Sequence, residues 1–209
     1  SGSASVWEAR FTPQEKGTYS YIFRFKEDGK TASETASATF KAAKGKGKGI
    51  LHTADNSTLV YDNGEPFRGV GINLCWESRT NDDSKFFKAL HEQHDRFSYD
   101  VMLPDFAANG GNFTRMWMCS WNFPIDRKDR FNNHRYTATA EYMNPSAVSH
   151  LDEVIRLAED LDIKIMLCMG QGDVRANRGF FNDEDAKARY RNYLRYIVAR
   201  WGYSPAIGM

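Results

Sequence analysis

The stretch IKIMLCMG, residues Ile163 to Gly170, is an apolar run in which Lys164 is the only charged residue. A run of this length and composition is typical of a β-strand that is buried on both faces, as in a parallel sheet. Residues 144–161 before it and residues 182–201 after it carry apolar side chains at helical spacing. A strand enclosed between two helices in this way predicts an α/β fold with a parallel sheet.

The signals for helix ends agree with this interpretation. Asn144 is a favoured N-cap residue, and Pro145 then occupies the first helical position, where proline is tolerated best. In the following helix, Asn182 is the predicted cap, acidic residues fill the first turn, and Gly202 ends the helix. Both helices therefore have predicted boundaries as well as an apolar face.

The same alternation of strands and helices extends toward the N-terminus. RGVGINLCW (68–76) and NFTRMWMCSW (112–121) are predicted strands, and helices are expected within residues 84–97 and 98–109. Pro104 must either start or kink the second of these helices, because proline cannot donate the backbone hydrogen bond of a helix interior. The chain therefore reads as β-α-β-α-β-α.

Two architectures fit this alternation: a doubly wound open sheet and a (β/α)8 barrel. After the last helix, residues 206–209 read as the start of another strand. The dinucleotide-binding fingerprint G-x-G-x-x-G is absent after the first strand, because GVGINL departs from it and its glycines lie inside the strand. This departure weakens the dinucleotide-binding interpretation.

Residues 1–43 follow a different pattern, with the period of two that is typical of strands. Three strands are expected there, in residues 6–11, 18–25 and 34–40. Three strands with one apolar face cannot close a sandwich by themselves. The sequence KGKGKG (44–49) is interpreted as a flexible linker rather than a phosphate site, because it is short and the chain is not basic. Residues 50–209 then form a separate predicted domain.

Composition excludes several classes of partner. The chain has 209 residues and a net charge of +1, which gives no electrostatic case for binding nucleic acid or a membrane surface. No apolar run is long enough to span a membrane. The cysteines, Cys75, Cys119 and Cys168, form no metal-ligand pattern and no disulfide framework. We therefore expect no metal and no cofactor, and the sequence carries no signal for an oligomeric state.

Parallel α/β folds carry their chemistry at the carboxyl ends of their strands. The predicted strand ends hold amides, indoles and charged groups: Asn73, Trp76, Glu77, Arg79, Arg115, Trp117, Trp121, Asn122, Gln171, Asp173 and Arg175. Amides and charged groups can hydrogen-bond sugar hydroxyls, and indoles can pack on pyranose rings. Arg115 fits either a site or a structural ion pair, Trp117 fits the core, and Glu77 is interpreted as a solvated loop carboxylate.

With these motifs placed, several stretches resemble the opening part of (β/α)8 glycoside hydrolases from the clan that includes family-five cellulases and mannanases. They are GVGINLCWES, ANGGNFTRMWM, NPSAVSHLDEVIRLAEDLDIKIMLCM and YRNYLRYIVARWGYSPAI. VWEARFTPQEKGTYSYIFRF is similar to the last strands of the immunoglobulin-like β-domain that precedes the barrel in some bacterial polysaccharide-degrading proteins. The resemblance implies the first three units of a TIM barrel, preceded by part of an immunoglobulin-like β-sandwich.

The resemblance also implies a mechanism. Enzymes of this clan that retain configuration use two glutamates, at the ends of the fourth and seventh strands, and both are expected after Met209. Residues 1–209 would then be inactive alone. Arg115 matches the arginine that supports the nucleophile carboxylate, whereas Glu77 matches no catalytic position. The substrate-binding residues that the resemblance implies are Asn73, Trp76, Trp121, Asn122 and Gln171.

Three functions remain open at this stage. The first is a secreted, periplasmic or cell-surface glycoside hydrolase whose partner is a carbohydrate substrate. The second is a non-catalytic carbohydrate-binding protein on the same scaffold, which would lack the two glutamates after Met209. The third is a barrel enzyme with phosphate or metal chemistry, which would need ligand carboxylates or histidines on its strand ends and is therefore disfavoured.

Overall fold

The chain divides into two compact units in the computed structural model. One unit is Phe11–Lys48, and the other combines Ser1–Arg10 with Gly49–Met209. The structure describes residues 7–45, 47–77, 97–119, 122–126, 143–169 and 180–208. The predicted boundary at residues 44–49 lies close to the end of the smaller unit. The two units are described separately.

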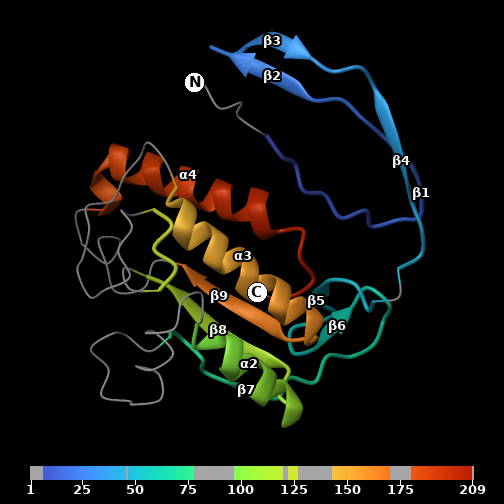
Figure 1. The fold of residues 1–209 in the computed structure, drawn as a ribbon, viewed down its shortest axis with the longest axis vertical. Helices are drawn as coiled ribbons and strands as arrows, with labels where there is room; N and C mark the ends of the chain where they lie inside the picture. Colours follow the sequence, from blue (N-terminus) through green and yellow to red (C-terminus); the bar gives the residue numbers. More distant parts are fainter. Residues whose placement is uncertain are drawn as a thin grey trace. The chain divides into compact units, whose positions relative to one another are not determined.

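The smaller unit is a two-stranded antiparallel ribbon that is interrupted near its middle (Figure 1). Its strands are β1 (Gly17–Tyr21), β2 (Arg24–Glu27), β3 (Lys30–Glu34) and β4 (Ala38–Ala42). β1 pairs with β4 and β2 pairs with β3. A bond from Thr35 N to Phe23 O (2.9 Å) joins the two halves.

The ribbon corrects the predicted strands of this region. Each of the expected strands at 18–25 and 34–40 is divided in two, because pairing is broken at Ile22–Phe23 and again over residues 35–37. Residues 7–11 form no strand, although their side chains alternate. Alternation predicts a strand only where a partner strand completes the hydrogen bonds. The assignment of this region to an immunoglobulin-like sandwich stays a prediction.

Aromatic side chains line the ribbon. The ring of Tyr19 stacks on Phe40 with centroids 5.3 Å apart, and Phe11 packs edge-on against Tyr19 at 5.7 Å. Tyr21 and Phe40 are about two-fifths exposed. A ribbon of two strands has no second layer to cover such a face.

The larger unit begins with a short hairpin and continues as an α/β arrangement. Its strands are β5 (Leu51–Thr53), β6 (Leu59–Tyr61), β7 (Gly71–Ile72), β8 (Phe113–Met118) and β9 (Lys164–Met169). Its helices are α2 (Tyr99–Ala108), α3 (Pro145–Asp160), the 3-10 turn η2 (Phe180–Asn182) and α4 (Glu184–Trp201). β5 and β6 form an antiparallel hairpin.

β7, β8 and β9 form a parallel sheet in their order along the chain. After α4 the chain returns to this sheet, where Ile207 forms a parallel bridge with Ile165. The bonds from Ile165 N to Ala206 O (2.7 Å) and from Gly208 N to Ile165 O (2.9 Å) hold this return. The start of a further strand, which the sequence predicted after the last helix, is therefore confirmed beside β9.

Gly71 of β7 must be a glycine, because β8 lies too close to it for a larger side chain. A Cβ atom at Gly71 would lie 2.7 Å from the backbone oxygen of Phe113. Real Cβ atoms do not come so close to a backbone oxygen, so a larger residue here would push the two strands apart. The glycine inside the predicted first strand thus serves strand packing.

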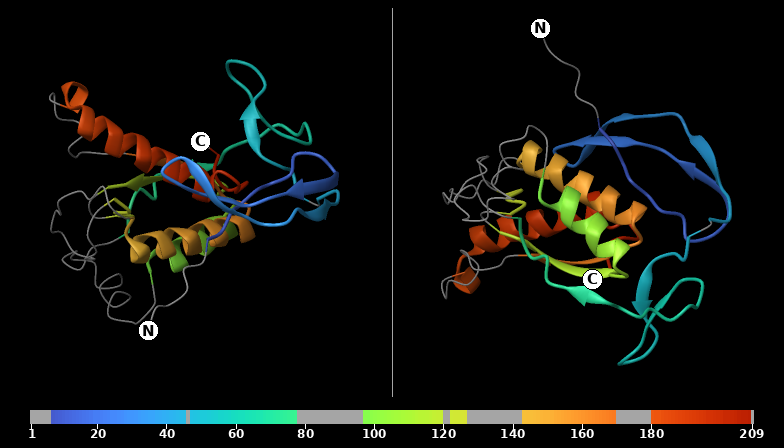
Figure 2. Two further views of the ribbon diagram at one scale, coloured as in Figure 1. Left: turned by 90° about the horizontal axis from the view of Figure 1, so that it is seen from above. Right: turned by 60° about the horizontal axis from the view of Figure 1, so that its bottom comes forward.

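Figure 2 shows α2 and α3 side by side on one face of the sheet, and α4 contributes buried side chains to the same core cluster. Along β8, Thr114, Met116 and Met118 are buried against the helices, and the residues between them are half-buried on the opposite face. Leu103 of α2, Ile155 of α3 and Trp201 of α4 belong to one core cluster with β8 and β9. A doubly wound fold places helices on both faces. Sequential strand order with helices on one face is consistent with part of a barrel.

The helix ends confirm one predicted cap and correct another. Asn144 caps α3, because its Oδ1 accepts a hydrogen bond from Ala147 N at 3.3 Å. In α4 the cap is Asp183 rather than Asn182, and its carboxylate accepts from Ala186 N at 2.9 Å. Asn182 instead ends η2, which places its backbone one residue too early for capping. Pro104 lies inside α2 and does not start that helix.

A polar contact ties α3 to α4. The carboxylate of Asp152 accepts hydrogen bonds from Arg200 Nε at 3.1 Å and from the indole nitrogen of Trp201 at 2.7 Å. Trp201 is 1% exposed, so its ring lies in the core while its polar atom has a partner. Among the residues that the structure describes, no helix is long and apolar enough to cross a membrane.

Candidate functional site

The open face of the sheet carries a cluster of cationic, aromatic and thiol side chains. Arg115 of β8 lies with its guanidinium carbon 5.4 Å from the centre of the Trp117 ring. Its Nη2 is 3.9 Å from the thiol of Cys75, which follows β7. Trp76 packs against Trp117 with ring centroids 4.9 Å apart. Strand alternation brings Arg115 and Trp117 to the face opposite the one on which the described helices pack.

Arg115 has no carboxylate partner among the described residues. Its Nε atom is buried and makes no hydrogen bond in this part of the chain. Burial raises the pKa of the Cys168 thiol on β9, and the positive charge of Arg115 opposes that rise. A half-buried guanidinium without a carboxylate is available to an acidic group that enters this face. The structural ion pair that the sequence left open is not formed by the described residues.

Two predicted cleft residues, Asn73 and Trp76, lie on the segment that follows β7. Asn73 is exposed, and Trp76 is 37% exposed while its ring contacts Trp117. The exposed part of Trp76 could support a sugar ring, because indoles pack well on apolar sugar faces. Trp121 and Gln171, which were also predicted to line the cleft, lie outside the described residues.

Asn122 is placed in the interior rather than on an open surface. Its amide nitrogen donates to the backbone oxygen of Trp117 at 2.9 Å and contacts Tyr99 Oη at 3.3 Å. Its Oδ1 accepts from the backbone nitrogen of Glu77 at 3.4 Å. Asn122 thus links the carboxyl ends of β7 and β8. The predicted contact with a sugar would require these bonds to be given up, so a structural role fits this geometry better.

Glu77 differs most from its sequence interpretation. It was expected to be a solvated loop carboxylate, but it is 2% exposed. Its Oε1 accepts from Tyr99 N at 3.0 Å, and its Oε2 lies 3.5 Å from His150 Nε2. Burial raises the pKa of Glu77 to about 8. The contact joins residues 73 positions apart in the chain, and no local pattern in the sequence indicates it.

His150 had no predicted role. It lies on α3 with its ring 3.7 Å from Phe97 and 5.0 Å from Phe123, centroid to centroid. Burial lowers the pKa of His150 to about 4. The apolar face of α3 could have indicated this burial, because His150 lies three residues after the buried Ala147 and four before the buried Val154.

The chemistry of the open face suits binding better than metal ligation. The described residues contain no group of three or more histidine, cysteine, aspartate or glutamate side chains placed to hold a metal ion. Indole faces, an amide and a guanidinium together offer stacking surfaces and hydrogen-bond donors. Such a set is suited to a neutral polyhydroxylated ligand beside an acidic group.

No profile of a known protein family matches the sequence, and no curated protein matches it. Solved structures do match the fold. A protein from Bacteroides vulgatus ATCC 8482, provisionally described as a glycoside hydrolase, has a TM-score of 0.59 and 18% identity over 95% of this chain and 41% of its own. A β-mannanase from the blue mussel Mytilus edulis has a TM-score of 0.51 and 16% identity over 78% of this chain and 44% of its own.

These likenesses define a class of fold. The chain is similar in structure to glycoside hydrolases, and at these identities the similarity is one of fold. It spans about two-fifths of the length of the solved structures that it matches. The partial coverage agrees with a sheet that holds the first strands of a barrel and leaves one face uncovered.

Proposed function

We propose that this chain is the N-terminal part of a glycoside hydrolase that acts on a polysaccharide or oligosaccharide. The observation that carries the proposal is the cluster of Arg115, Trp117 and Trp76 at the carboxyl ends of parallel strands. This edge is where barrel enzymes build their sites. The similarity in fold to glycoside hydrolases supports the same conclusion.

The proposed mechanism is double displacement with retention of configuration. A carboxylate nucleophile and an acid/base carboxyl would lie about 5–5.5 Å apart. Both glutamates are proposed to follow Met209 in the natural protein. Arg115 would donate hydrogen bonds to the nucleophile carboxylate, because its guanidinium has no other carboxylate among the described residues. A charge-assisted bond of this kind fixes the nucleophile and keeps it ionised.

The proposed substrate cleft follows from the same face. Asn73 and Trp76 would contact the sugar directly, and Trp121 and Gln171 would complete the cleft. One matching structure is a β-mannanase, so mannans are the first polymers to test. Polymers of this kind lie outside the cell, so we propose a secreted, periplasmic or cell-surface location. We also propose that the aromatic ribbon (17–42) is part of an immunoglobulin-like domain.

The residues that follow Met209 in the natural protein test this proposal. We expect mass spectrometry of the protein from its source to show a longer chain. Its sequence should place one glutamate at the end of a fourth strand and another at the end of a seventh. Other residues at both positions would reject the hydrolase.

The alternative is a protein that binds carbohydrate without cleaving it. Arg115 Nε has no hydrogen-bond partner among the described residues, and aromatic rings with a guanidinium are sufficient for binding. Binding to mannan without release of reducing ends would favour this alternative. Replacement of Trp76 by alanine should then reduce binding, because its exposed ring would be the stacking surface.

A further inference from the structure

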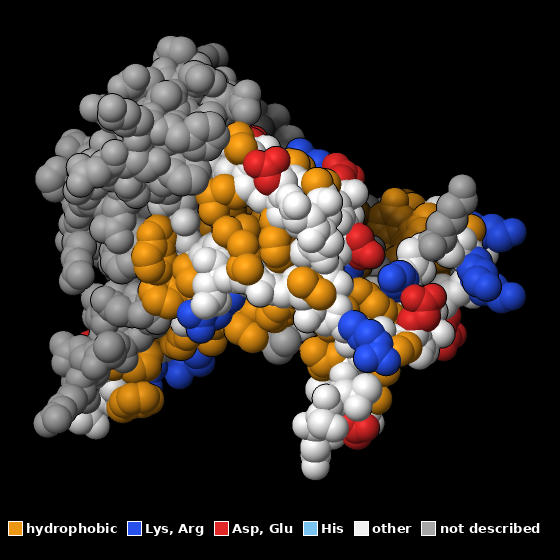
Figure 3. Space-filling model, turned by 90° about the horizontal axis from the view of Figure 1, so that it is seen from below, with side chains coloured by type: hydrophobic (Ala, Val, Ile, Leu, Met, Phe, Trp, Pro, Cys, Tyr) orange, Lys and Arg blue, Asp and Glu red, His pale blue; other side chains and the backbone are white. Residues whose placement is uncertain are grey.

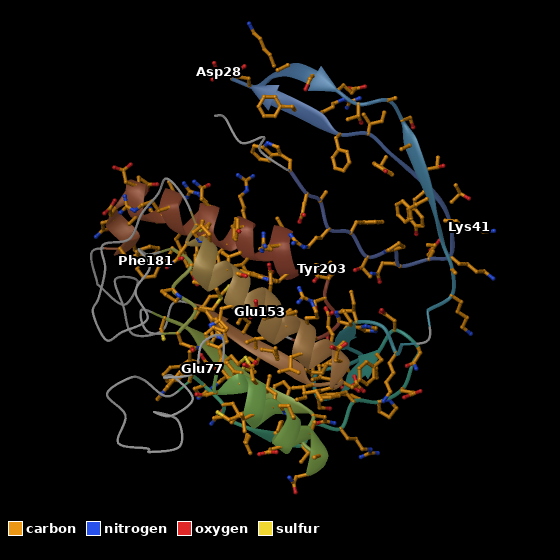
Figure 4. All side chains as sticks on the ribbon, in the orientation of Figure 1. Asp28, Lys41, Glu77, Glu153, Phe181 and Tyr203 are labelled. Atoms are coloured by element: carbon orange, nitrogen blue, oxygen red, sulfur yellow. The ribbon has the colours of Figure 1, made fainter. Side chains whose placement is uncertain are left out.

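A buried polar contact joins the end of β7 to the third helix. The Oε2 atom of Glu77 and the Nε2 atom of His150 face each other at 3.5 Å. Neither atom makes a hydrogen bond with the described residues. Their side chains are 1% and 10% exposed. Figure 4 shows Glu77 near the ends of the strands and Glu153 on α3.

The energetics of burial limit the protonation states of this pair. An ionised carboxylate beside a neutral imidazole would leave one uncompensated charge in the interior. An imidazolium beside a carboxylic acid would do the same. A single proton shared by the two groups keeps the pair neutral overall, and it can bridge the two facing atoms. The geometry therefore favours one proton on two groups.

We propose that Glu77 and His150 form a buried one-proton pair, with the proton on Glu77 Oε2 directed at His150 Nε2, which holds the end of β7 against α3. The inference goes beyond the proposed function, because it does not depend on any reaction with sugars. It assigns a positioning role to a carboxyl that matches no predicted catalytic residue.

The groups around Glu77 support a protonated carboxyl. The largest effect is burial, which raises the pKa of Glu77 to about 8. The bond from Tyr99 N opposes that rise, and the negative charge of Asp100 on α2 adds to it. The Tyr99 phenol stays neutral, because burial raises its pKa well above the usual value. Residues 122–126 present the uncharged amide of Asn122 and, toward His150, the ring of Phe123.

The pair holds a segment that belongs to the candidate site. The backbone nitrogen of Glu77 is bonded to Asn122, and the preceding residue is Trp76, whose ring packs on Trp117. Tyr99, which donates its backbone N–H to Glu77, also donates its hydroxyl to the Leu74 carbonyl at 3.1 Å. A charge on Glu77 would therefore disturb the segment that carries Trp76.

The pair gives a defined dependence of stability on pH. The folded pKa of Glu77 is raised, so its contribution is complete below pH 4.5 and is lost as the pH rises toward about 8. The folded pKa of His150 is lowered, so its contribution is complete above pH 6.5 and is lost as the pH falls toward about 4. The folded and unfolded states hold equal numbers of protons on this pair between pH 4.5 and 6.5. Between pH 6.5 and about 8 the folded state holds one more.

Chemical unfolding at several pH values tests this proton count. We would compare the full-length natural protein with its Glu77→Gln variant and with Glu153→Gln, which makes the same substitution at an exposed position of α3. For the natural protein and the control, this pair should lower the folding equilibrium constant about tenfold per pH unit between pH 6.5 and 8. In Glu77→Gln that decline should be absent. Parallel curves for all three proteins would overturn the proposal.

A measurement on the unmodified protein covers the case in which Glu77→Gln does not fold. The imidazole nitrogen resonances of His150, assigned by their loss in His150→Gln, should report a neutral ring throughout pH 5–8. A protonated ring at pH 6 with a midpoint near the ordinary value of 6.5 would overturn the proposal.

Discussion

At the scale of single residues, the carboxyl ends of β7 and β8 are joined by side chains rather than by the sheet alone. β7 is short, and its ladder with β8 ends at Ile72, after which the backbone bond from Trp117 N to Cys75 O (2.8 Å) continues the contact. Beyond that point Asn122 bonds the backbone of Trp117 and of Glu77. The position of Trp76, one residue before Glu77, therefore depends on a buried amide.

Replacement of Asn122 by alanine tests this dependence. The variant leaves buried backbone groups at both strand ends without their partner, which costs about 1–3 kcal/mol of unfolding free energy. Urea denaturation gives this value directly. The matched control is Asn73→Ala, because Asn73 is an exposed residue of the same type and should change stability by less than about 0.5 kcal/mol. An equal effect of the two substitutions would contradict the structural role of Asn122.

At the scale of elements, the sequence predicted best where the pattern is local. The apolar run of β9 and the cap and proline that begin α3 are confirmed. These features depend on residues within one or two turns of each other. The ribbon strands were predicted less well, because side-chain alternation does not show where hydrogen-bonded pairing is interrupted.

The candidate site shows the same limit. The sequence left Arg115 open between a site and an ion pair and assigned Trp117 to the core, and the structure brings both together with Trp76. The burial of Glu77 and Asn122 could not be predicted, because it depends on α2 and α3 packing over the strand ends. Such contacts join parts of the chain that are far apart in sequence, and the periodicity of apolar residues does not indicate them.

The start of α4 offers a prediction at this scale. Asp183→Ala removes the carboxylate that accepts from Ala186 N, so it should cost about 0.5–2 kcal/mol of unfolding free energy. Asn182→Ala is the matched control and should cost much less, because Asn182 precedes the cap. Denaturation with the two variants side by side distinguishes them. A larger loss with Asn182→Ala would return the cap to the residue that the sequence indicated.

At the scale of the whole molecule, the sheet leaves apolar side chains uncovered. Among the described residues of β7, β9 and their approaches, Val70 is 59%, Ile72 is 53% and Met169 is 40% exposed. Figure 3 shows hydrophobic side chains spread between charged ones on one face of the molecule. Exposed apolar surface beside the last parallel strand favours association with other polypeptide segments that would cover it.

Residues 1–209 produced alone should therefore self-associate or remain partly folded. The proposed continuation of the barrel would cover these side chains, so the full-length natural protein should stay monodisperse under the same conditions. Sedimentation velocity over a range of concentrations compares the two. A monodisperse 209-residue monomer with a sharp cooperative unfolding transition would show that this face needs no cover.

The most direct test of the hydrolase is the release of reducing ends from mannan by the full-length natural protein. Our account predicts turnover by that protein and none by residues 1–209. It also predicts a loss of kcat of about 100-fold or more in Arg115→Met, because the nucleophile carboxylate loses its charged donor. Binding of mannan without any release of reducing ends by the full-length protein would contradict the hydrolase and support a carbohydrate-binding protein.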